Sequence, residues 1–543
     1  MSSRGQMIDK IISVFFYCLV VIGVLLHFKI NYMFGLDDSY ITFRYAQNFS
    51  EGYGLRFNVD EKYFGSTAMG FALLLGVLSY IIDTVTHHSI FIKDQIADVG
   101  VWIPVMANLL SAISIGAMVI VLFRIGNSLL SVRLSFVFSV FFGIFIFISP
   151  ISERVSGHET CLYLALLLVG LYLLYFSNRY FIAGISIGLA ATVRPDSYLM
   201  FLIAASILLV RYFVGRQNPR SLKSVISFTG GFLLLVIPWM IFCHVYFGQI
   251  LPGTLDAKQA QALLGDFPVY SFDILAKETI LFFEWYLLSA FVLATVSAII
   301  LLILMNRSIV AIFNHASLCM IVSLLLFGFG QFIAYCLMSV SFWPWYLHPV
   351  WFSIMMASII SIMELLSYLS VSGWVNIWSS LTLLIVFVLG ELSFFQTNNP
   401  IEKWLSLWSE GKRSIWDHPY SYDPIVRYLK EKEPKGTTVA TAEPGALGFK
   451  LGPAFKVVDE LGLTSPGVAK KLIAGDVRYL FATWNPEYVI VSWDGSYTSH
   501  KADWFNKQYE LIGEFDRQDY WKERIHHGAY LFKKRIQSHQ ESQ

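Results

Sequence analysis

The fold of this chain is decided near its N-terminus, by IISVFFYCLVVIGVLLHFKI at residues 11–30 and DDSYITFRYAQN at residues 37–48. The first run has about 20 residues, the length that a helix needs to cross the hydrocarbon core of a bilayer. It has no small-residue cleavage site, so we interpret it as an uncleaved membrane span and not as a secretory signal. The second run places two adjacent acidic residues, Asp37 and Asp38, just beyond that span.

The composition agrees with a membrane protein. Of 543 residues, 56% are hydrophobic and 14% are charged, and the mean hydropathy is +0.59. In soluble domains roughly 45–50% of the residues are hydrophobic and about 25% are charged. The 39 Lys and Arg nearly balance the 38 Asp and Glu, so net charge gives no support for a nucleic-acid partner. The five cysteines lie in apolar stretches without the spacing of metal ligands.

We predict an α-helical polytopic membrane protein whose transmembrane domain covers residues 1–394 and includes a large first outer loop at 31–98. Within that loop, residues 37–49 and 68–82 are expected to form helices that lie at the membrane interface. Apolar windows predict about eleven crossings, at residues 11–30, 99–123, 134–150, 159–176, 180–194, 197–214, 225–246, 279–304, 316–341, 350–370 and 374–394.

The basic residues of the short loops fall on the side where the chain begins, which predicts a cytoplasmic N-terminus. An odd number of crossings then places residues 395–543 on the outer face of a bacterial cytoplasmic membrane. The composition of this part predicts a small extracytoplasmic (periplasmic) α/β domain. Its expected helix is Pro424–Lys432, and its expected strands are Thr437–Ala442, Phe455–Val458, Tyr488–Trp493 and Ala529–Phe532.

Asp37 and Asp38 are the first candidates for chemistry. A carboxylate at the membrane surface can deprotonate an attacking hydroxyl group, as sugar transfer requires. Two adjacent carboxylates could also hold a divalent cation that neutralises a phosphate leaving group. The alternative is that the pair only ends the span and caps the following helix, which is common at helix N-termini.

Several short motifs resemble, in order, those of a subgroup of the GT-C membrane glycosyltransferases that includes actinobacterial terminal arabinofuranosyltransferases. The first is DDSYITFRYAQN at 37–48 with EGYGLRFN at 51–58. The others are SGHET at 156–160, TVRPD at 192–196, YFG at 246–248, LPGT at 251–254 with AK at 257–258, AEPGALG at 442–448 and DELGL at 459–463. The chain departs from the subgroup pattern at Gly253, where Asn is usual, and at Pro444, where Ala is usual.

The resemblance implies a GT-C fold and transfer of a sugar from a polyprenyl-phosphate donor to a cell-envelope glycan or glycolipid acceptor. It implies that Asp37 is the base that activates the acceptor and that Asp38 supports it or helps to hold a cation.

Two basic residues are candidates for the donor phosphate. Arg194 ends a short Gly- and Ala-rich span before Pro195, and a guanidinium near membrane depth normally faces a cavity or a partner. Paired hydrogen bonds suit it to a phosphate. The alternatives are snorkelling towards the headgroups and a structural pair with Asp196. Lys258 is the second candidate, because of its place in the motif that runs from residue 251 to residue 258.

The remaining candidates are expected to line a substrate cavity: Arg44, His158, Glu159, Tyr346, His348 and Glu443. No nucleotide-binding glycine loop and no serine-hydrolase or zinc-protease motif occurs in the sequence. Two other classes of protein would also be polytopic, a glycolipid transporter or flippase and a non-catalytic envelope assembly protein. The candidate residues cluster at one end of the spans, which favours the enzyme.

Overall fold

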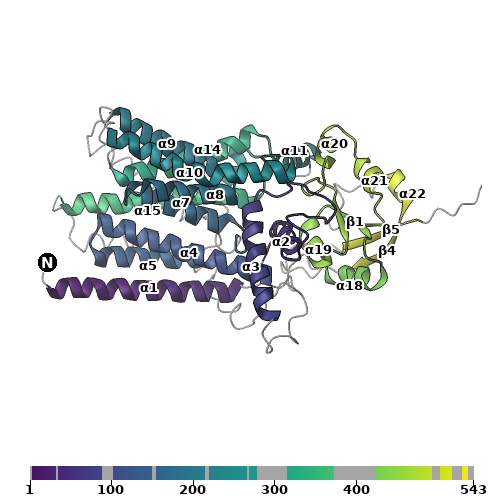
Figure 1. Cartoon of the computed structure of the whole chain (residues 1–543), viewed down its shortest axis with the longest axis horizontal. Coiled ribbons are helices and arrows are strands. Elements are labelled where there is room, and N and C mark those ends of the chain that lie inside the picture. Colours follow the sequence, from purple (N-terminus) through teal and green to yellow (C-terminus); the bar gives the residue numbers. More distant parts are fainter. Residues whose placement is uncertain are drawn as a thin grey trace, which may run out of the picture.

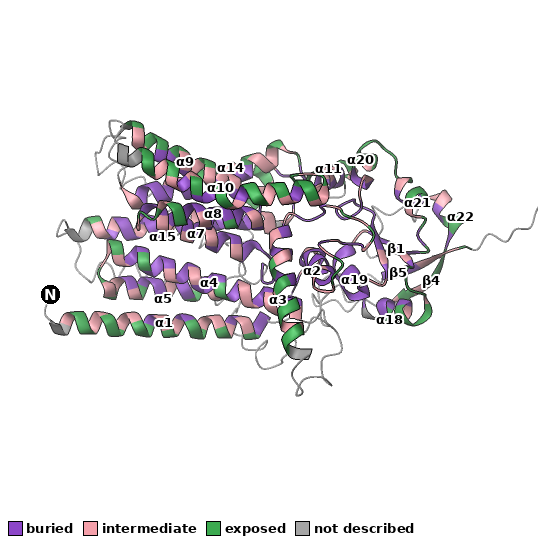
Figure 2. Ribbon diagram, in the orientation of Figure 1, coloured by how far each residue is buried: buried purple, intermediate pink, exposed green. Residues whose placement is uncertain are grey.

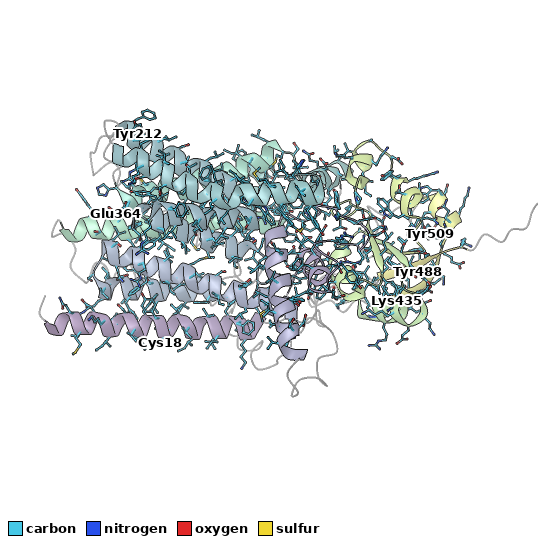
Figure 3. All side chains as sticks on the ribbon, viewed as in Figure 1. Cys18, Tyr212, Glu364, Lys435, Tyr488 and Tyr509 are labelled. Atoms are coloured by element: carbon cyan, nitrogen blue, oxygen red, sulfur yellow. The ribbon has the colours of Figure 1, made fainter. Side chains whose placement is uncertain are left out.

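The computed structural model shows a helical bundle that carries a small α/β domain at one end (Figure 1). It describes residues 3–31, 35–87, 102–148, 155–214, 219–265, 268–277, 315–371, 422–491, 502–515 and 529–535. The N-terminus lies at the opposite end of the bundle from the C-terminal domain, as do Tyr212 and Glu364, whereas Tyr488 and Tyr509 mark the domain itself (Figures 1 and 3). We call the end that carries the domain the domain end.

The bundle contains nine helices among the described residues that coincide with predicted spans. They are α1 (Ser3–Asn31), α4 (Trp102–Leu129), α5 (Val132–Ile148), α7 (Thr160–Tyr175), α8 (Tyr180–Val193), α9 (Ser197–Val214), α10 (Pro219–Phe247), α14 (Ala316–Leu337) and α15 (His348–Val371). Five of them (α1, α4, α10, α14 and α15) are long and apolar enough to cross a membrane, and the other four are shorter apolar helices. The predicted spans at 279–304 and 374–394 lie outside the described residues, so the count of eleven stays a prediction.

Small residues let two of these helices approach closely. A Cβ on Gly184 of α8 would lie 2.1 Å from the carbonyl oxygen of Phe228 in α10, and a Cβ on Gly231 would lie 2.1 Å from that of Phe181. Such contacts drive helix association in membranes, where no hydrophobic effect acts between helices. Helix α1 instead buries few of its apolar side chains and leaves many exposed, as a helix that faces lipid does (Figure 2).

The first loop forms two helices, as predicted. Helix α2 (Asp37–Ser50) is almost entirely buried, and α3 (Met69–His87) runs across the domain end of the bundle rather than along it (Figure 1). Gly70 makes this crossing close, because a Cβ there would lie 2.3 Å from the carbonyl oxygen of Thr192 in α8. The orientation of α3 fits a segment that lies at the interface.

The C-terminal domain is built on a five-stranded sheet in the order β2-β1-β3-β5-β4. Its first three strands are parallel and the last two pairings are antiparallel. The strands are β1 (Thr438–Thr441), β2 (Lys456–Asp459), β3 (Tyr488–Val491), β4 (Tyr509–Phe515) and β5 (Ala529–Lys534), and the helices are α18 (Asp423–Lys432), α19 (Pro444–Leu451), α20 (Val468–Ile473), α21 (Tyr479–Trp484) and α22 (Asp503–Gln508).

Four strands and the helix over residues 424–432 confirm the predictions, whereas β4 was missed. Its sequence YELIGEF leaves most side chains exposed at the sheet edge and lacks an apolar signal.

The two faces of the sheet belong to different cores. Val439, Val457 and Ile490 join a hydrophobic cluster that is continuous with that of the helical bundle. Ala440, Val458 and Val489 alternate with them and pack on the opposite face, under α20, α21 and α22. The sheet is therefore fused to the bundle through α2 and α19 in one continuous core. The expected domain boundary at residue 395 lies outside the described residues and stays a prediction.

Arg44 joins the two parts. Its guanidinium is fully buried and donates hydrogen bonds to the carbonyl oxygens of Phe57 (2.6 Å), Gly448 (2.5 Å) and Phe455 (2.8 Å) and to Oδ1 of Asn58 (3.1 Å). The sequence predicted this side chain in a substrate cavity. The structure corrects that prediction, because all of these partners are protein atoms of the first loop and the C-terminal domain.

We expect Arg44→Met to destabilise the protein by about 3–5 kcal/mol, because it leaves four buried acceptors without their charged donor. Thermal unfolding of the purified protein in detergent measures this loss. Arg535→Met is the matched control: its guanidinium is exposed and contacts an exposed Glu510, so a change within about 0.5 kcal/mol is expected. Equal melting temperatures for the two variants would contradict the assignment.

Candidate active site

Asp37 stands at the first position of α2 and contacts the C-terminal domain. Its Oδ1 accepts a hydrogen bond from the backbone N–H of Ala446, 2.7 Å away, in the first turn of α19. Helix α19 has no side-chain cap of its own, and α2 has none either. Asp37 therefore caps α19, a helix that begins about four hundred residues later, and not the helix that it begins.

The surroundings of Asp37 make its carboxyl group basic. Although part of the side chain is exposed, desolvation by the surrounding protein raises its pKa, and so do the negative charges of Glu443 and Asp38. The N–H groups of Ala446 and Gly445 lower the pKa but do not outweigh these effects, and the pKa reaches about 8. A carboxylate with a pKa near neutral pH is suited to proton abstraction.

Asp38 faces a different set of residues. It interacts electrostatically with Lys258 of α11 (Thr254–Leu264) and with Tyr346. Lys258 is buried, and its Nζ lies 5.1 Å from the ring centroid of Trp343 and 5.7 Å from that of Tyr346. Burial lowers the pKa of Lys258, while the charges of Asp38 and Asp459 raise it. The structure thus brings the acidic pair and one predicted phosphate ligand together.

Arg194 is held in a buried ionic cluster. Its Nε donates to Asp196 (2.7 Å), one terminal nitrogen donates to Glu159 (2.8 Å) and the other donates to the hydroxyl of Tyr335 (3.3 Å). The structural pair with Asp196 that the sequence left open is therefore present. Two carboxylates face one guanidinium here, and two of its five N–H groups take no part in these three bonds.

Tyr346 connects this cluster to the acidic pair. Its ring stacks on that of Tyr335 at a centroid distance of 5.6 Å. Tyr346 also interacts electrostatically with Asp38 and with Arg194. Tyr346 thus interacts electrostatically with Asp38 and stacks on Tyr335, which is hydrogen-bonded to Arg194. That the acidic pair and Arg194 share an open, outward-facing hollow stays a prediction.

The other candidates lie at different depths around this set. His158 is buried, with its ring 6.3 Å from that of Trp345 and its Nδ1 3.7 Å from Glu159. His348 is fully buried in an aromatic cluster, 5.5 Å from the ring of Trp351, so the structure moves it from the expected cavity mouth into the core. Glu443 is the residue before α19, and its carboxylate accepts a hydrogen bond from the hydroxyl of Tyr422.

The expected divalent cation has little support from the geometry. Among the described residues, no three His, Cys, Asp or Glu side chains gather as metal ligands would. Asp37 already accepts a backbone N–H, and Asp38 lies near an ammonium group. The described donor set therefore does not fit such an ion by itself, and no step below is derived through one.

Sequence reasoning missed Tyr335, Trp343 and Ala446, all of which contact predicted site residues. The first two lie in apolar or aromatic runs that any membrane boundary would carry. Ala446 contributes a backbone group, which no residue type reveals.

The DELGL motif has a structural explanation. Asp459 accepts hydrogen bonds from the N–H groups of Leu461 (2.8 Å) and Thr464 (2.9 Å) and so shapes the loop that packs against the first loop.

Comparison with known proteins supports the fold. The chain is similar to the crystal structure of the Archaeoglobus fulgidus oligosaccharyltransferase tethered with an acceptor peptide, with a TM-score of 0.51 and 14% identity over 88% of this chain and 69% of that one. This likeness is one of fold, and it agrees with the GT-C fold that the motifs predict. A second structure of that enzyme, with Zn and sulfate, gives a TM-score of 0.41 and 13% identity over 87% of this chain and 67% of that one.

The other two comparisons add less. A family model described as a domain of unknown function, DUF8728, matches residues 413–532, which correspond to the C-terminal domain. No curated protein matches the sequence. The GT-C fold predicted from the motifs is therefore supported, whereas the finer resemblance to arabinofuranosyltransferases is not.

We expect Arg194→Met alone to cost about 3–5 kcal/mol of stability, because it leaves the buried carboxylate of Glu159 and the partly buried carboxylate of Asp196 without their cationic partner. The triple variant Glu159→Gln, Arg194→Met, Asp196→Asn removes all three charges and is expected to recover most of that loss. Thermal unfolding in detergent compares the two. A triple variant less stable than the single one would show that the guanidinium does not compensate these carboxylates.

Proposed function

We propose that this chain is a membrane glycosyltransferase that moves a sugar from a polyprenyl-phosphate donor to a cell-envelope glycan or glycolipid acceptor. The reaction is proposed to occur at the outer face of a bacterial cytoplasmic membrane, with the domain end of the bundle outward. One observation carries the proposal: the acidic pair begins α2 at the domain end of the bundle, and Asp38 there interacts electrostatically with the buried Lys258. Arg194 belongs to the same end, because Thr192, two residues before it, packs against Gly70 of α3.

In the proposed reaction Asp37 is the general base. The acceptor hydroxyl attacks the anomeric carbon while its proton passes to the Asp37 carboxylate, and the bond between that carbon and the phosphate oxygen breaks. The electron pair of that bond leaves with the polyprenyl phosphate. The pKa of Asp37, raised to about 8 mainly by burial and by Glu443, makes the carboxylate a better proton acceptor than an exposed aspartate.

The leaving phosphate gains negative charge, which nearby cations stabilise. Lys258 is the best placed of the predicted ligands, since its ammonium lies over the rings of Trp343 and Tyr346 and near Asp38. Arg194, which is bonded to Tyr335, is proposed to stabilise the phosphate with its two remaining N–H groups. In a buried, low-dielectric site such fixed charges stabilise developing charge more strongly than they would in water.

The remaining side chains would line the path of the sugar. Tyr346 lies between the two cations, and aromatic rings bind the apolar faces of sugars well. His158 lies next to Glu159, and its Nε2 has no hydrogen-bond partner among the described residues. We propose that both side chains contact the donor sugar.

The direct test incubates the purified protein with a panel of polyprenyl-phosphate sugars, with and without chelator, because the motifs do not specify the sugar. Transfer to an envelope glycan or glycolipid supports the proposal. If no donor in the panel is consumed while the protein is folded and monodisperse, the proposed function is wrong.

Asp37→Asn is expected to reduce turnover by about 100- to 10,000-fold, because an amide cannot accept the proton. Asparagine caps a helix as well as aspartate does, so the melting temperature should remain that of the wild type. Asp60→Asn is the matched control, an exposed carboxylate of the same loop that pairs with Lys456. Near-normal turnover of Asp37→Asn would exclude Asp37 as the base.

Turnover is expected to rise with pH through the pKa of Asp37, about 8, since only the ionised carboxylate accepts a proton. Glu443→Gln removes a negative charge that raises this pKa, so the rise should move to lower pH. The measurement is kcat/KM from pH 5 to 10. Glu433→Gln is the control because its carboxylate pairs with Tyr488 and Lys533 instead. Equal profiles for the two variants would contradict the assigned coupling.

A further inference from the structure

We propose that the C-terminal domain completes the catalytic site, with the first turn of α19 acting as the cradle that positions Asp37. Gly445 and Ala446 are in this view positioning residues, and the domain is not an accessory module. The inference rests on the proposed function, because it assigns what orients the proposed base.

The carboxylate of Asp37 reaches the N-terminus of α19 in the geometry of a helix cap. Pro444 is the first residue of α19, so Ala446 is the third, and the N–H at this position is the one that a capping side chain usually accepts. The hydrogen bond of 2.7 Å joins residues that are 409 positions apart in the chain. The partial positive charge of a helix N-terminus adds to this bond.

Gly445 makes the close approach of the two helices possible. A Cβ at this position would lie 2.0 Å from the carbonyl oxygen of Asp37 and 2.8 Å from its Oδ2. Any other residue would therefore push α19 away from α2 and crowd the second carboxylate oxygen. The glycine therefore lets the Asp37 carboxylate lie against the first turn of α19, with Oδ1 on the N–H of Ala446.

A second contact, one helical turn later, fixes the orientation of α19. Gly448 lies on the same face as Gly445, and its carbonyl oxygen accepts a hydrogen bond from Arg44 of α2. A Cβ on Gly448 would lie 2.8 Å from a terminal nitrogen of Arg44. The two contacts are about one turn apart on α19 and two turns apart on α2, so they oppose rotation of α19 about Asp37.

Charged groups around this contact come from several elements. Asp38 belongs to α2 itself, and Glu443 stands before α19 with Tyr422 bonded to it at the start of α18. Lys258 of α11 faces Asp38.

The decisive pair of variants separates the backbone N–H of residue 446 from its side chain. Ala446→Pro deletes the N–H donor to Asp37 at a first-turn position that tolerates proline, and Ala446→Gly changes the side chain but keeps the donor. We expect Ala446→Pro to lower kcat by about 10- to 100-fold, the equivalent of one charge-assisted hydrogen bond. The KM for the polyprenyl-phosphate sugar should not change. Ala446→Gly should keep at least half of the wild-type kcat.

A merely structural contact would give a different result. If proline and glycine at 446 lower kcat equally, or if proline raises the KM for the donor and leaves kcat unchanged, the cradle is excluded. The variant Gly445→Ala is an independent test of the cradle. It keeps every N–H but inserts a methyl group at the carboxylate, so a further loss of kcat is expected, whereas wild-type kcat would overturn the proposal.

A measurement without substrate separates this inference from the proposed function. Hydrogen–deuterium exchange, read by mass spectrometry, reports the protection of amides in residues 443–451. We expect Asp37→Ala to speed exchange there at least tenfold, and Asp37→Asn and Asp38→Ala to leave it near the wild-type rate. Unchanged exchange in Asp37→Ala would refute the cradle even if transfer occurs. If the wild-type protein transfers no sugar, the proposed function is refuted. The exchange measurement would still show whether Asp37 holds the first turn of α19.

Discussion

The rest of the structure depends on the burial of one charge, the guanidinium of Arg44. A buried cation is stable only where its N–H groups meet acceptors, and here those acceptors are carbonyl and amide oxygens from the first loop and from the C-terminal domain. The face of the Phe57 ring, 4.6 Å away, completes its surroundings. Satisfying Arg44 therefore forces three distant segments to one place and fixes the position of α2 at the end of the bundle.

This constraint explains why an acidic pair can be held in a fixed orientation at the surface of a membrane. Helix α2 is short and lies between a bundle and a sheet, with its tyrosine and phenylalanine rings buried against both. Tyr40 and Phe43 pack on Phe449 of α19, so apolar contact and the polar bonds of Arg44 act on the same helix pair. A rigid element of this kind can present Asp37 and Asp38 more accurately than a loop could.

The site also shows how two predicted phosphate ligands differ physically. Lys258 lies under aromatic rings and near carboxylates, a setting in which its ammonium can exchange one anionic partner for another. Arg194 is already bonded to two carboxylates and a phenol, so it first of all holds α8, the start of α9 and α14 together. Fold similarity at 14% identity cannot distinguish these roles, because a shared fold hosts many different sites.

Much of the architecture was predictable because membrane spans and buried strands are local signals. A helix that crosses a bilayer must be apolar over its whole length, so hydropathy located nine helices that the structure confirms. The acidic pair, Arg194 and Lys258 stood out as charges beside apolar runs. The edge strand β4 did not, because neither of its faces is fully buried.

The sequence by itself thus determined a polytopic helical chain with a small α/β domain and the residues most worth testing. Only the tertiary structure decided that Asp37 caps a helix of the C-terminal domain, that Arg44 is a clamp and that Arg194 is paired with two carboxylates. The reason is physical. These contacts join residues up to 411 positions apart and use backbone groups, which every residue possesses, so no local pattern distinguishes the ones that meet.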